Sequence, residues 1–396
     1  MKKIALVSSG DLPIPAVKGG AVETLLELLV EQNEVENKVH FIVVSCNNEK
    51  AKEKSKKYAN STFLYIKKNN FIEDKVSKVT YLMNKLSKLF LHNEIPTYSG
   101  YYRRALKKLL KENPDFVVFE GGPRPTGFFC FTKYFNRDQL VIHLHGNWFP
   151  SKFISNMFGR VISVSKFIED EYLSTCSNKE VKAFTVYNTV NQKALKTQVT
   201  KNERNELRQK LSFSDDDIIV VFCGRICADK GVLELIKAIK LCDDRVKLLI
   251  IGSPHFAEKE HSKYLNDVKK IVNESPEKIV FTGFIPNKDV YKYYKISDIH
   301  CISSTWEEPG ALVNIEGMTT GLPMIVTKSG GNSEYVSPKC ALLIDKGIDL
   351  ISNLKSAITL LENDSQKRFE MSKKSLERSE LFSNLNFYIS YLRSFE

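Results

Sequence analysis

The chain has 396 residues, of which 42% are hydrophobic and 27% charged, a composition that excludes a disordered protein and predicts about two domains. No apolar run approaches the roughly 18 residues of a membrane-spanning helix, and the apolar stretch near the start is too short for a secretion signal. The net charge is +11, and residues 1–200 carry all of it, with 30 Lys and Arg against 19 Asp and Glu. We therefore expect a cytoplasmic protein whose basic first half either meets an anionic partner (nucleic acid, membrane surface or acidic substrate) or simply favours solubility.

Strand and helix signals alternate along most of the chain. In the first half, short apolar runs predict strands at 3–8, 39–45, 62–66, 115–120, 139–144, 160–164 and 182–187, with a helix at 20–32. In the second half, strands are expected at 217–223, 246–251, 278–282, 298–302, 324–327 and 340–344. Helices are expected between and after them, at 231–241, 256–274, 287–296, 311–320, 349–362 and 364–378. Two such series predict an α/β protein of two doubly wound domains, with a polar boundary near 188–203.

Residues 75–111 interrupt this alternation. They predict two basic amphipathic helices, at 75–91 and 99–111, around a turn at 93–96. Such helices lie on an anionic membrane, with aromatic side chains at headgroup level, or cover a sheet with their lysines in water. Four basic residues that flank Tyr101 and Tyr102 mark the candidate membrane or acceptor contact: Arg103, Arg104, Lys107 and Lys108.

Common metal and phosphate motifs are absent from the sequence. The eight cysteines are scattered without a CxxC pair, which predicts reduced thiols and no zinc site. There is no GxxxxGK[ST] loop, no GxGxxG after the first strand, no HExxH and no GxSxG. Asp215–Asp217 resembles a DxD metal motif, but its position before a strand favours a solvated turn. We expect no metal and no cofactor.

Three separated segments carry candidate chemistry. Gly19 and Gly20 open the first helix, where glycines allow close approach of a ligand and the helix N-terminus attracts an anion; an ordinary turn is the alternative. Arg225 ends the first strand of the second domain and Lys230 precedes the next helix. Two cations in that place suit a diphosphate, and two surface charges are the alternative.

The third segment contains two carboxylates eight residues apart, Glu308 and Glu316. If a helix begins near Gly310, Glu308 lies in the loop before it and Glu316 within it, two turns apart. Glu316 stands among apolar residues, and a buried carboxylate needs partners such as sugar or ribose hydroxyls. A capping acid followed by an exposed acid is the alternative.

Together these segments resemble the GT-B-fold retaining glycosyltransferases of family GT4. The matching pieces, in chain order, are Gly19-Gly20, His143-Leu-His145-Gly146, 161–165 (VISVS), 188–191 (NTVN), Gly224-Arg225, Lys230-Gly231, Glu308 with Glu316, 321–323 (GLP) and 330–334 (GGNSE). The resemblance implies two Rossmann-like domains facing a central cleft: an acceptor-binding domain at 1–196, a nucleotide-sugar-binding domain at 197–380, and a C-terminal helix at 381–396 that crosses back to the first domain.

The resemblance also implies roles for single residues. His145 and Glu308 match the residues beside the reacting sugar, Arg225 and Lys230 match the diphosphate pair, and Glu316 matches the ribose-binding glutamate. The remaining donor-binding positions are Gly19, Gly20, Phe284, Ile285, Gly310, Ala311 and Leu312. The sequence departs from the family at Gly310-Ala311, where Phe-Gly is common, and this departure bears on which sugar is bound.

The function implied is a retaining, metal-independent transfer of a hexose from a UDP-sugar to a glycan or lipid-linked acceptor. Bacterial surface polysaccharide assembly at the inner face of the membrane is the setting we expect. Two alternatives stay open. A GT-B-type nucleotide-sugar epimerase would use the same cleft, and a basic nucleic-acid-binding protein would need exposed stacking aromatics, for which Tyr101-Tyr102 is the one hint.

Overall fold

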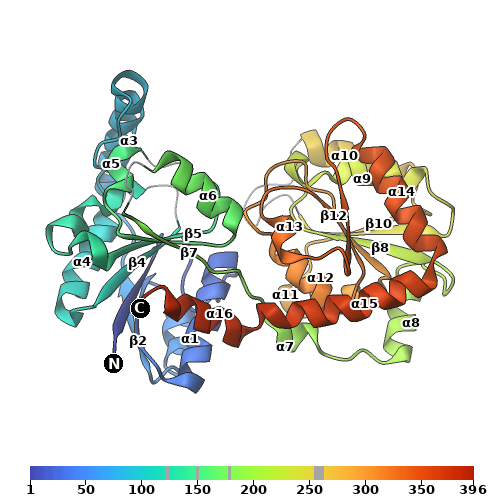
Figure 1. Cartoon of the computed structure of the whole chain (residues 1–396), viewed down its shortest axis with the longest axis horizontal. Helices are drawn as coiled ribbons and strands as arrows, with labels where there is room; N and C mark the ends of the chain where they lie inside the picture. The colour runs from blue at the N-terminus through green and yellow to red at the C-terminus, as the bar shows by residue number, and fades with distance from the viewer. Residues whose placement is uncertain (122–124, 149–150, 177–179, 254–262) are drawn as a thin grey trace. The chain divides into compact units, whose positions relative to one another are not determined.

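The computed structural model describes the chain except for residues 122–124, 149–150, 177–179 and 254–262, and it divides into two compact units. Unit 1 comprises Met1–Asn188 and Asn384–Glu396, and unit 2 comprises Thr189–Ser383 (Figure 1). From the sequence we place the corresponding limits at 196/197 and 380/381. The segment from 384 onward is therefore part of unit 1, although unit 2 separates it from the rest of that unit along the chain.

Unit 1 is built on a seven-stranded parallel sheet in the order β3-β2-β1-β4-β5-β6-β7. Its strands are β1 (Lys3–Ser8), β2 (His40–Cys46), β3 (Ser61–Ile66), β4 (Phe116–Glu120), β5 (Leu140–Leu144), β6 (Arg160–Ser163) and β7 (Lys182–Thr185). Its helices are α1 (Ala21–Glu36), α2 (Glu49–Ser55), α3 (Phe71–Leu91), α4 (Gly100–Glu112), η1 (Pro125–Lys133), η2 (Arg137–Gln139), α5 (Lys152–Ser155), α6 (Lys166–Thr175) and α16 (Asn384–Arg393).

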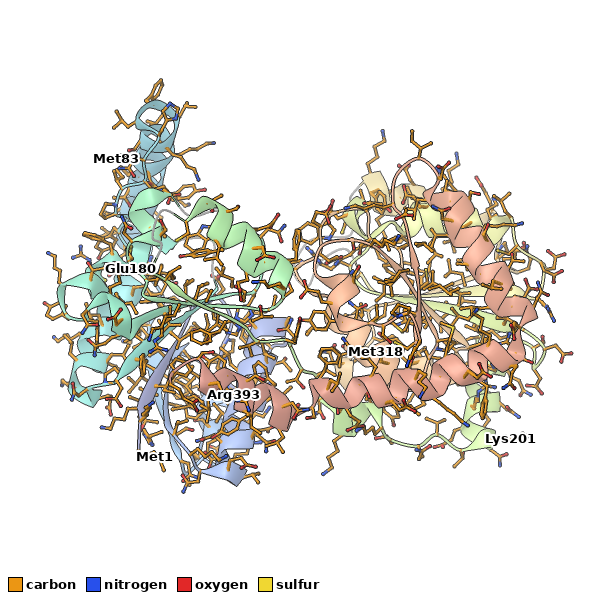
Figure 2. All side chains as sticks on the ribbon, in the orientation of Figure 1. Met1, Met83, Glu180, Lys201, Met318 and Arg393 are labelled. Carbon is orange, nitrogen blue, oxygen red and sulfur yellow. The ribbon has the colours of Figure 1, made fainter. Side chains whose placement is uncertain are left out.

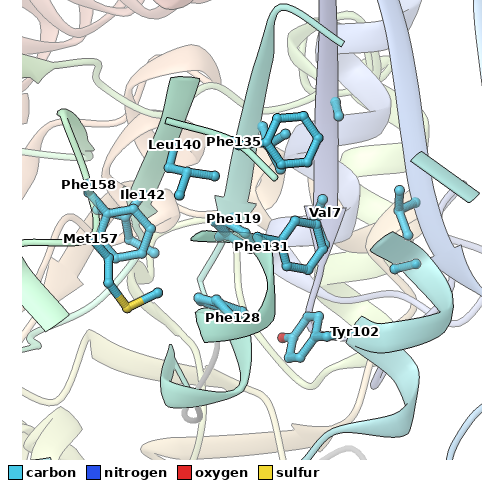
Figure 3. Packing of buried hydrophobic residues seen from close by; sticks show 14 of the residues in the cluster. Val7, Tyr102, Phe119, Phe128, Phe131, Phe135, Leu140, Ile142, Met157 and Phe158 are labelled. Carbon is cyan, nitrogen blue, oxygen red and sulfur yellow. The ribbon is translucent and has the colours of Figure 1, made fainter. Parts of the chain in front are cut away.

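The two faces of this sheet bury different sets of side chains. Since successive residues of a strand point to opposite faces, Ile4 and Leu6 pack with side chains of α1 and α16. Ala5 and Val7 pack with side chains of α4 and η1 on the other face. There Phe119 stacks on Phe128 with ring centroids 4.1 Å apart (Figure 3).

Unit 2 repeats this architecture with a six-stranded parallel sheet in the order β10-β9-β8-β11-β12-β13. Its strands are β8 (Ile218–Cys223), β9 (Val246–Ile251), β10 (Ile279–Gly283), β11 (Ile299–Ile302), β12 (Met324–Thr327) and β13 (Ala341–Ile344). Its helices are α7 (Gln192–Leu195), α8 (Lys201–Lys210), η3 (Ala228–Lys230), α9 (Val232–Lys240), α10 (Lys263–Asn273), α11 (Asn287–Ile296), α12 (Leu312–Thr319), α13 (Asn332–Tyr335), α14 (Leu350–Asn363), α15 (Ser365–Ser379) and η4 (Glu380–Phe382).

In each sheet the strand order reverses at one point, between β1 and β4 in unit 1 and between β8 and β11 in unit 2. Loops leave the carboxyl ends of the two strands in opposite directions there, and ligands of doubly wound folds bind at such a point. The prediction of two doubly wound domains is confirmed. The first part of the helix expected at 256–274 lies outside the described residues. Among the described helices, none is long and apolar enough to cross a membrane.

Candidate active site

The loop between β8 and α9 carries the two cations that the sequence analysis singled out. Gly231 closes this loop with φ 64°, and a Cβ there would collide with the carbonyl oxygen of Ser303. The hydroxyl of Ser303 donates to the carbonyl of Lys230 at 2.9 Å, and the amide of Thr305 donates to the carbonyl of Asp229 at 2.9 Å. The loops after β8 and β11 are therefore held together at the point where the strand order reverses.

Lys230 and Glu308 form a direct ion pair. The Lys230 ammonium lies 2.5 Å from Glu308 Oε1, and the Ser304 hydroxyl donates to the same oxygen at 2.5 Å. Glu308 is only 2% exposed, so these partners compensate the loss of water around its charge. From the sequence we assigned the two residues to different parts of a ligand, and the structure places them in contact.

Arg225 is the unpaired cation of this loop. Its side chain is exposed and makes no hydrogen bond or ion pair with the described residues. A guanidinium at the carboxyl end of a central strand, with its donors unused, suits a phosphate or carboxylate ligand.

Glu316 lies in α12, where its carboxylate meets α11. Tyr294, which is fully buried, donates its hydroxyl to Glu316 Oε2 at 2.8 Å. Burial raises the pKa of Glu316. Burial, and then the charge of Glu316, also raise the pKa of Cys223 to about 12, which places the carboxylate close to the end of β8. No sequence signal marks Tyr294, because a tyrosine in a helix usually packs without a specific polar role.

The start of α12 is fixed by the loop that follows β12. Gly310 has φ 154°, and a Cβ on it would lie 2.6 Å from the Tyr335 ring. Asn332 Oδ1 accepts from the Ala311 amide at 3.1 Å and from Asn314 Nδ2 at 2.8 Å. The helix therefore begins at Leu312, one residue later than the predicted 311–320, because Ala311 is extended.

Phe284 and Ile285 follow β10, as expected, and they differ in exposure. Phe284 is 54% exposed, whereas Ile285 packs against the core beside α11 and α12. Gly283, with φ 71°, turns the chain out of the strand. The exposed ring offers a flat apolar surface of the kind that a nucleobase stacks on.

In unit 1, His145 belongs to a buried cluster centred on Glu120. Oε2 of Glu120, at the end of β4, lies 2.8 Å from His143 Nδ1 and 3.0 Å from His145 Nε2. The Tyr391 hydroxyl of α16 donates to Oε1 at 2.9 Å. The roles of Glu120 and Tyr391 in this cluster were not predicted from the sequence. An acid at the end of one buried strand, beside a neighbouring strand that ends in His-Leu-His, is the signal that could have found Glu120.

The charges of this cluster follow from its burial and its donors. Burial alone would raise the pKa of Glu120, but His143 and His145 outweigh it and bring the pKa to about 2. Burial, together with the neighbouring His143, lowers the pKa of His145 to about 4. At neutral pH the cluster therefore contains an ionised carboxylate and a neutral His145.

A cavity of about 290 Å³ lies over this cluster, at the carboxyl ends of β1, β4 and β5. Its lining includes Ser9, Glu23, Glu120, Gly121, His145 and Trp148. Gly19 and Gly20 adopt φ 75° and 103°, in the region that favours glycine. A Cβ on Gly20 would clash with the carboxyl group of Glu23, and burial raises the pKa of this acid. The expected anion site at the start of α1 therefore already faces a carboxyl group.

The basic helices differ from expectation. Tyr101 and Tyr102 are each 5% exposed and pack in the core, so they neither reach a membrane nor stack on a nucleic acid. Figure 3 shows Tyr102 in this core. Arg104 is bound to Glu73 at 2.6 Å and to the carbonyls of residues 67 and 68. Lys108 donates to the carbonyl of Tyr65 at 3.0 Å. Two of the four basic positions therefore hold α4 in place.

The other two basic positions of α4 are exposed. The Arg103 guanidinium lies 4.9 Å from the centre of the Tyr98 ring, and Lys107 faces solvent. The larger exposed surface belongs to α3, which stands away from the sheet of unit 1 and carries Met83 near its outer end (Figures 1 and 2). Exposed apolar side chains surround this helix: Phe71, Ile72, Val76, Val79, Tyr81, Leu82, Met83, Leu86, Leu89, Phe90 and Leu91.

One group of described residues has the composition of a metal site. The ligand atoms of Glu120, His143 and His145 lie within 4.8 Å of one another. In the structure, Glu120 Oε2 receives hydrogen bonds from both rings, so a cation would have to replace both bonds.

Comparison with known proteins gives consistent results for sequence and structure. Residues 203–378 match the family model described as glycosyl transferases group 1. Spore coat protein SA of Bacillus subtilis (strain 168) is 26% identical over 96% of this chain and 94% of its own length. The lipopolysaccharide 1,2-N-acetylglucosaminetransferase of Salmonella typhimurium (strain LT2) is 27% identical over 50% of this chain and 51% of its own length. The crystal structure of Anabaena Alr3699/HepE in complex with UDP has the same fold, with a TM-score of 0.73, 17% identity and coverage of 100% and 99%.

Proposed function

We propose that this chain, a glycosyltransferase that belongs to the group 1 family and has the GT-B fold, transfers a hexose from a UDP-sugar with retention of anomeric configuration. The acceptor is a glycan or a lipid-linked saccharide of bacterial surface polysaccharide assembly. The relatives support this setting, since one is named as a lipopolysaccharide N-acetylglucosaminetransferase and another as a teichuronic acid biosynthesis glycosyltransferase.

The observation that carries the donor assignment is the arrangement around the ends of β8 and β11. Arg225 offers an unpaired guanidinium, Lys230 adds a second cation, and Glu316 presents a carboxylate beside the end of β8. A diphosphate fits the cations, and vicinal ribose hydroxyls fit the carboxylate. The structures of Alr3699/HepE with UDP and with UDP-glucose support a uridine nucleotide as the ligand.

The environment of Glu308 supports a mechanism without a carboxylate nucleophile. Lys230 and Ser304 both donate to Glu308 Oε1, so in this proposal the carboxylate serves as the partner of Lys230 and does not take the nucleophile role that a carboxylate has in a retaining glycosidase. We infer a front-face displacement. The bond from the anomeric carbon to the diphosphate breaks, the acceptor oxygen forms a bond on the same face, and the leaving phosphate takes the acceptor proton. Arg225 and Lys230 stabilise the leaving group, so the step needs no metal ion.

In this proposal unit 1 binds the acceptor. Helix α3 of this unit contacts an anionic membrane. Lys75, Lys78, Lys85 and Lys88 are interleaved with the exposed apolar side chains of α3. Lysine charges attract anionic lipid, and apolar and aromatic side chains enter the headgroup region. The contact therefore moves from both basic helices, as the sequence suggested, to α3, because α4 uses its apolar face in the core.

A panel of nucleotide sugars tests the proposed function. UDP and UDP-hexoses should raise the melting temperature in proportion to the logarithm of their concentration, and GDP- and ADP-sugars should not. With the stabilising donor and a saccharide acceptor, ¹H NMR should show a new glycoside with the donor's anomeric configuration, and EDTA should leave the rate unchanged. Inversion of the anomeric configuration would contradict the retaining mechanism, and loss of activity in EDTA would contradict metal independence. A preference for another nucleotide would contradict the UDP donor. Conversion of the UDP-sugar without transfer would indicate an epimerase.

A further inference from the structure

We propose that Glu120, clamped by Tyr391, is a positioning residue that fixes His145 as the neutral tautomer protonated on Nε2 and directs its Nδ1 lone pair to a substrate hydroxyl. The inference rests on the proposed function in one respect, the presence of a sugar substrate in the cavity over His145. The tautomer itself follows from the hydrogen bonds of unit 1.

The tautomer of His145 follows from the number of donors that Glu120 receives. His143 Nδ1, His145 Nε2 and the Tyr391 hydroxyl surround one carboxylate at 2.8, 3.0 and 2.9 Å. The side chain of Glu120 has no exposed surface. An ionised carboxylate offers acceptors only, so both ring nitrogens that touch it must carry protons. Its pKa of about 2 agrees with this assignment.

The opposite nitrogens of the two rings lie in different environments. Nε2 of His143 is buried and has no partner among the described residues. The side chain of His145 is 13% exposed, it lines the cavity, and its Nδ1 has no partner among the described residues. Nδ1 of His145 is therefore the acceptor that a ligand in this cavity reaches.

This arrangement selects the chemical class of the bound group. A neutral imidazole nitrogen accepts a hydrogen bond from a hydroxyl, and it gives a phosphate or carboxylate no proton to bind. Glu23, at the start of α1, is a second acid of the lining, and the lining residues that the structure describes include no lysine or arginine. The site therefore fits an uncharged polyol, such as a sugar ring that donates a hydroxyl proton to His145.

Tyr391 makes the cluster dependent on the C-terminal segment. It is fully buried in α16, between Phe387 and Phe395, and it supplies the third donor to Glu120. Without that donor, Oε1 of Glu120 would be a buried acceptor with no partner, and the carboxylate would be free to turn. Among the described residues, the titratable groups around His145 are thus Glu120 from β4, His143 from β5 and Glu23 from α1, and Tyr391 from α16 acts on it through Glu120.

The test reads the tautomer directly in the ligand-free, full-length protein. Long-range ¹H–¹⁵N correlation spectra of protein labelled on histidine report which nitrogen carries the proton, and the His145→Gln variant assigns the signals. At pH 7 we expect His145 protonated on Nε2 alone. In Glu120→Gln, whose amide accepts at one atom and donates at the other, both tautomers of His145 should appear. Tyr391→Phe should broaden or shift the signal while the fold persists.

Kinetics separate positioning from structure. With the donor identified above, Glu120→Gln should lower kcat at least tenfold, Tyr391→Phe should lower it severalfold, and both should leave the affinity of unit 2 for UDP within twofold. Glu120→Asp should recover part of the loss. Glu53→Gln, which removes an exposed carboxylate of the same unit, is the control.

Three results would overturn the inference. They are an Nδ1-protonated or charged His145 at pH 7, an unchanged spectrum and kcat in Glu120→Gln, or loss of the His145 and His143 signals on adding Zn²⁺ together with activity that EDTA abolishes. The last would make the cluster a metal site. If Glu120→Gln does not fold, Tyr391→Phe and Glu120→Asp provide the same readouts. If no nucleotide sugar is turned over, the proposed function fails while the tautomer is still measured.

Discussion

Arg225 and Lys230 are both cations of the proposed diphosphate site, but they hold different partners in the structure. Arg225 has no partner among the described residues, so Arg225→Ala should weaken UDP binding without changing the melting temperature. Loss of a charge-assisted hydrogen bond costs about 1.5–3 kcal/mol, which is about 10- to 100-fold in Kd. Titration calorimetry with UDP measures the affinity. Unchanged affinity would remove Arg225 from the site.

Lys230→Ala should weaken UDP binding and also destabilise unit 2. It leaves Glu308, 2% exposed, without its cation, and breaking a buried ion pair from one side costs about 3–5 kcal/mol. Adding Glu308→Gln should restore stability but not binding. Lys237→Ala, an exposed lysine of α9, is the matched control. A Lys230→Ala protein that melts like the wild type would show that the pair does not stabilise the fold.

Two buried histidines predict a loss of stability in acid. Burial lowers the pKa of His300 to about 3, and neither ring nitrogen has a partner among the described residues; the pKa of His145 is about 4. Both pKa values lie below the pKa of about 6.5 that a histidine has in the unfolded chain. Between the folded and unfolded pKa values, the unfolded chain therefore binds more protons than the folded protein. The stability that neutral histidines contribute is complete above pH 6.5 and is lost as the pH falls.

At pH 5.0 each of these histidines should lower the free energy of unfolding by about 2 kcal/mol relative to pH 7.5. Urea unfolding at the two pH values measures this difference. His300→Leu should reduce it by about half, because the substituted side chain does not titrate, whereas His92→Gln, on the exposed end of α3, should leave it unchanged. An equal pH dependence in His300→Leu would show that His300 titrates normally in the folded protein.

At the scale of elements, the start of α12 depends on Gly310. Gly310→Ala places a methyl group 2.6 Å from the Tyr335 ring, in a backbone conformation that favours glycine, and should destabilise unit 2 by about 1–3 kcal/mol. UDP affinity should fall as well, since α12 carries Glu316. Gly347 also has a positive φ, 117°, but no atom of the described residues lies within 4 Å of the position that a methyl group would take, so comparing Gly310→Ala with Gly347→Ala by thermal unfolding tests the steric effect. Equal losses in both variants would remove the argument about Tyr335.

The exposed face of α3 predicts membrane binding that requires both charge and apolar side chains. Leu86→Asp combined with Phe90→Asp should abolish sedimentation with anionic vesicles, and UDP binding by unit 2 should be unchanged. Lys85→Glu with Lys88→Glu should also abolish it, and added salt should weaken binding by the wild type because it screens the attraction. Ile348→Asp, at a fully exposed apolar residue of unit 2, is the control. No sedimentation of the wild type with anionic vesicles at low salt would exclude this contact.

The strands could be predicted from sequence because parallel strands are buried on both faces and appear as short apolar runs. Elements without that signal were missed. The sequence of α8, KNERNELRQK, has a single leucine, so no apolar face marks it as a helix. α3 and α4 have similar basic amphipathic patterns, yet only the apolar face of α4 is covered. It packs against η1, where the ring of Phe128 contacts Tyr102. Local periodicity shows that a face is apolar but does not show which element covers it.

The candidate site was predictable where a single segment defines a residue's position. The sequence placed Arg225 at the end of the first strand of the second domain, Lys230 before the next helix and Glu308 in the loop before a later helix, because each position follows from its own segment. The contact between Lys230 and Glu308, and the four-membered cluster around Glu120, depend on pairing between residues 23 to 271 positions apart. No sequence period reports such pairs.

At the scale of the whole molecule, the chain completes unit 1 only with its last residues. It leaves this unit at Asn188 and returns at Asn384. On its return, α16 packs against α1: Tyr388 donates to Asn33 Oδ1 at 2.6 Å, and the aromatic side chains of this helix join the core on that face of the sheet. The C-terminal residues are also tied to the sheet, because the carbonyl of Ser394 accepts from Arg160 at 2.6 Å.

Removal of Asn384–Glu396 should therefore destabilise unit 1 selectively. The deletion exposes the apolar face that α16 covers and removes the Tyr391 hydroxyl from Glu120, whereas Thr189–Ser383 keeps its own core. Scanning calorimetry should show one transition at a lower temperature and a second that UDP still raises, because Arg225 and Glu316 lie in unit 2. Phe387→Ala, at a residue 3% exposed, should lower the free energy of unfolding of unit 1 by about 3–5 kcal/mol. The same transition should therefore move to a lower temperature, but by less than in the deletion. Leu385→Ala, on the exposed side of α16, is the matched control. If the deletion instead lowered both transitions equally, or neither, the returning helix would not be the element that completes unit 1.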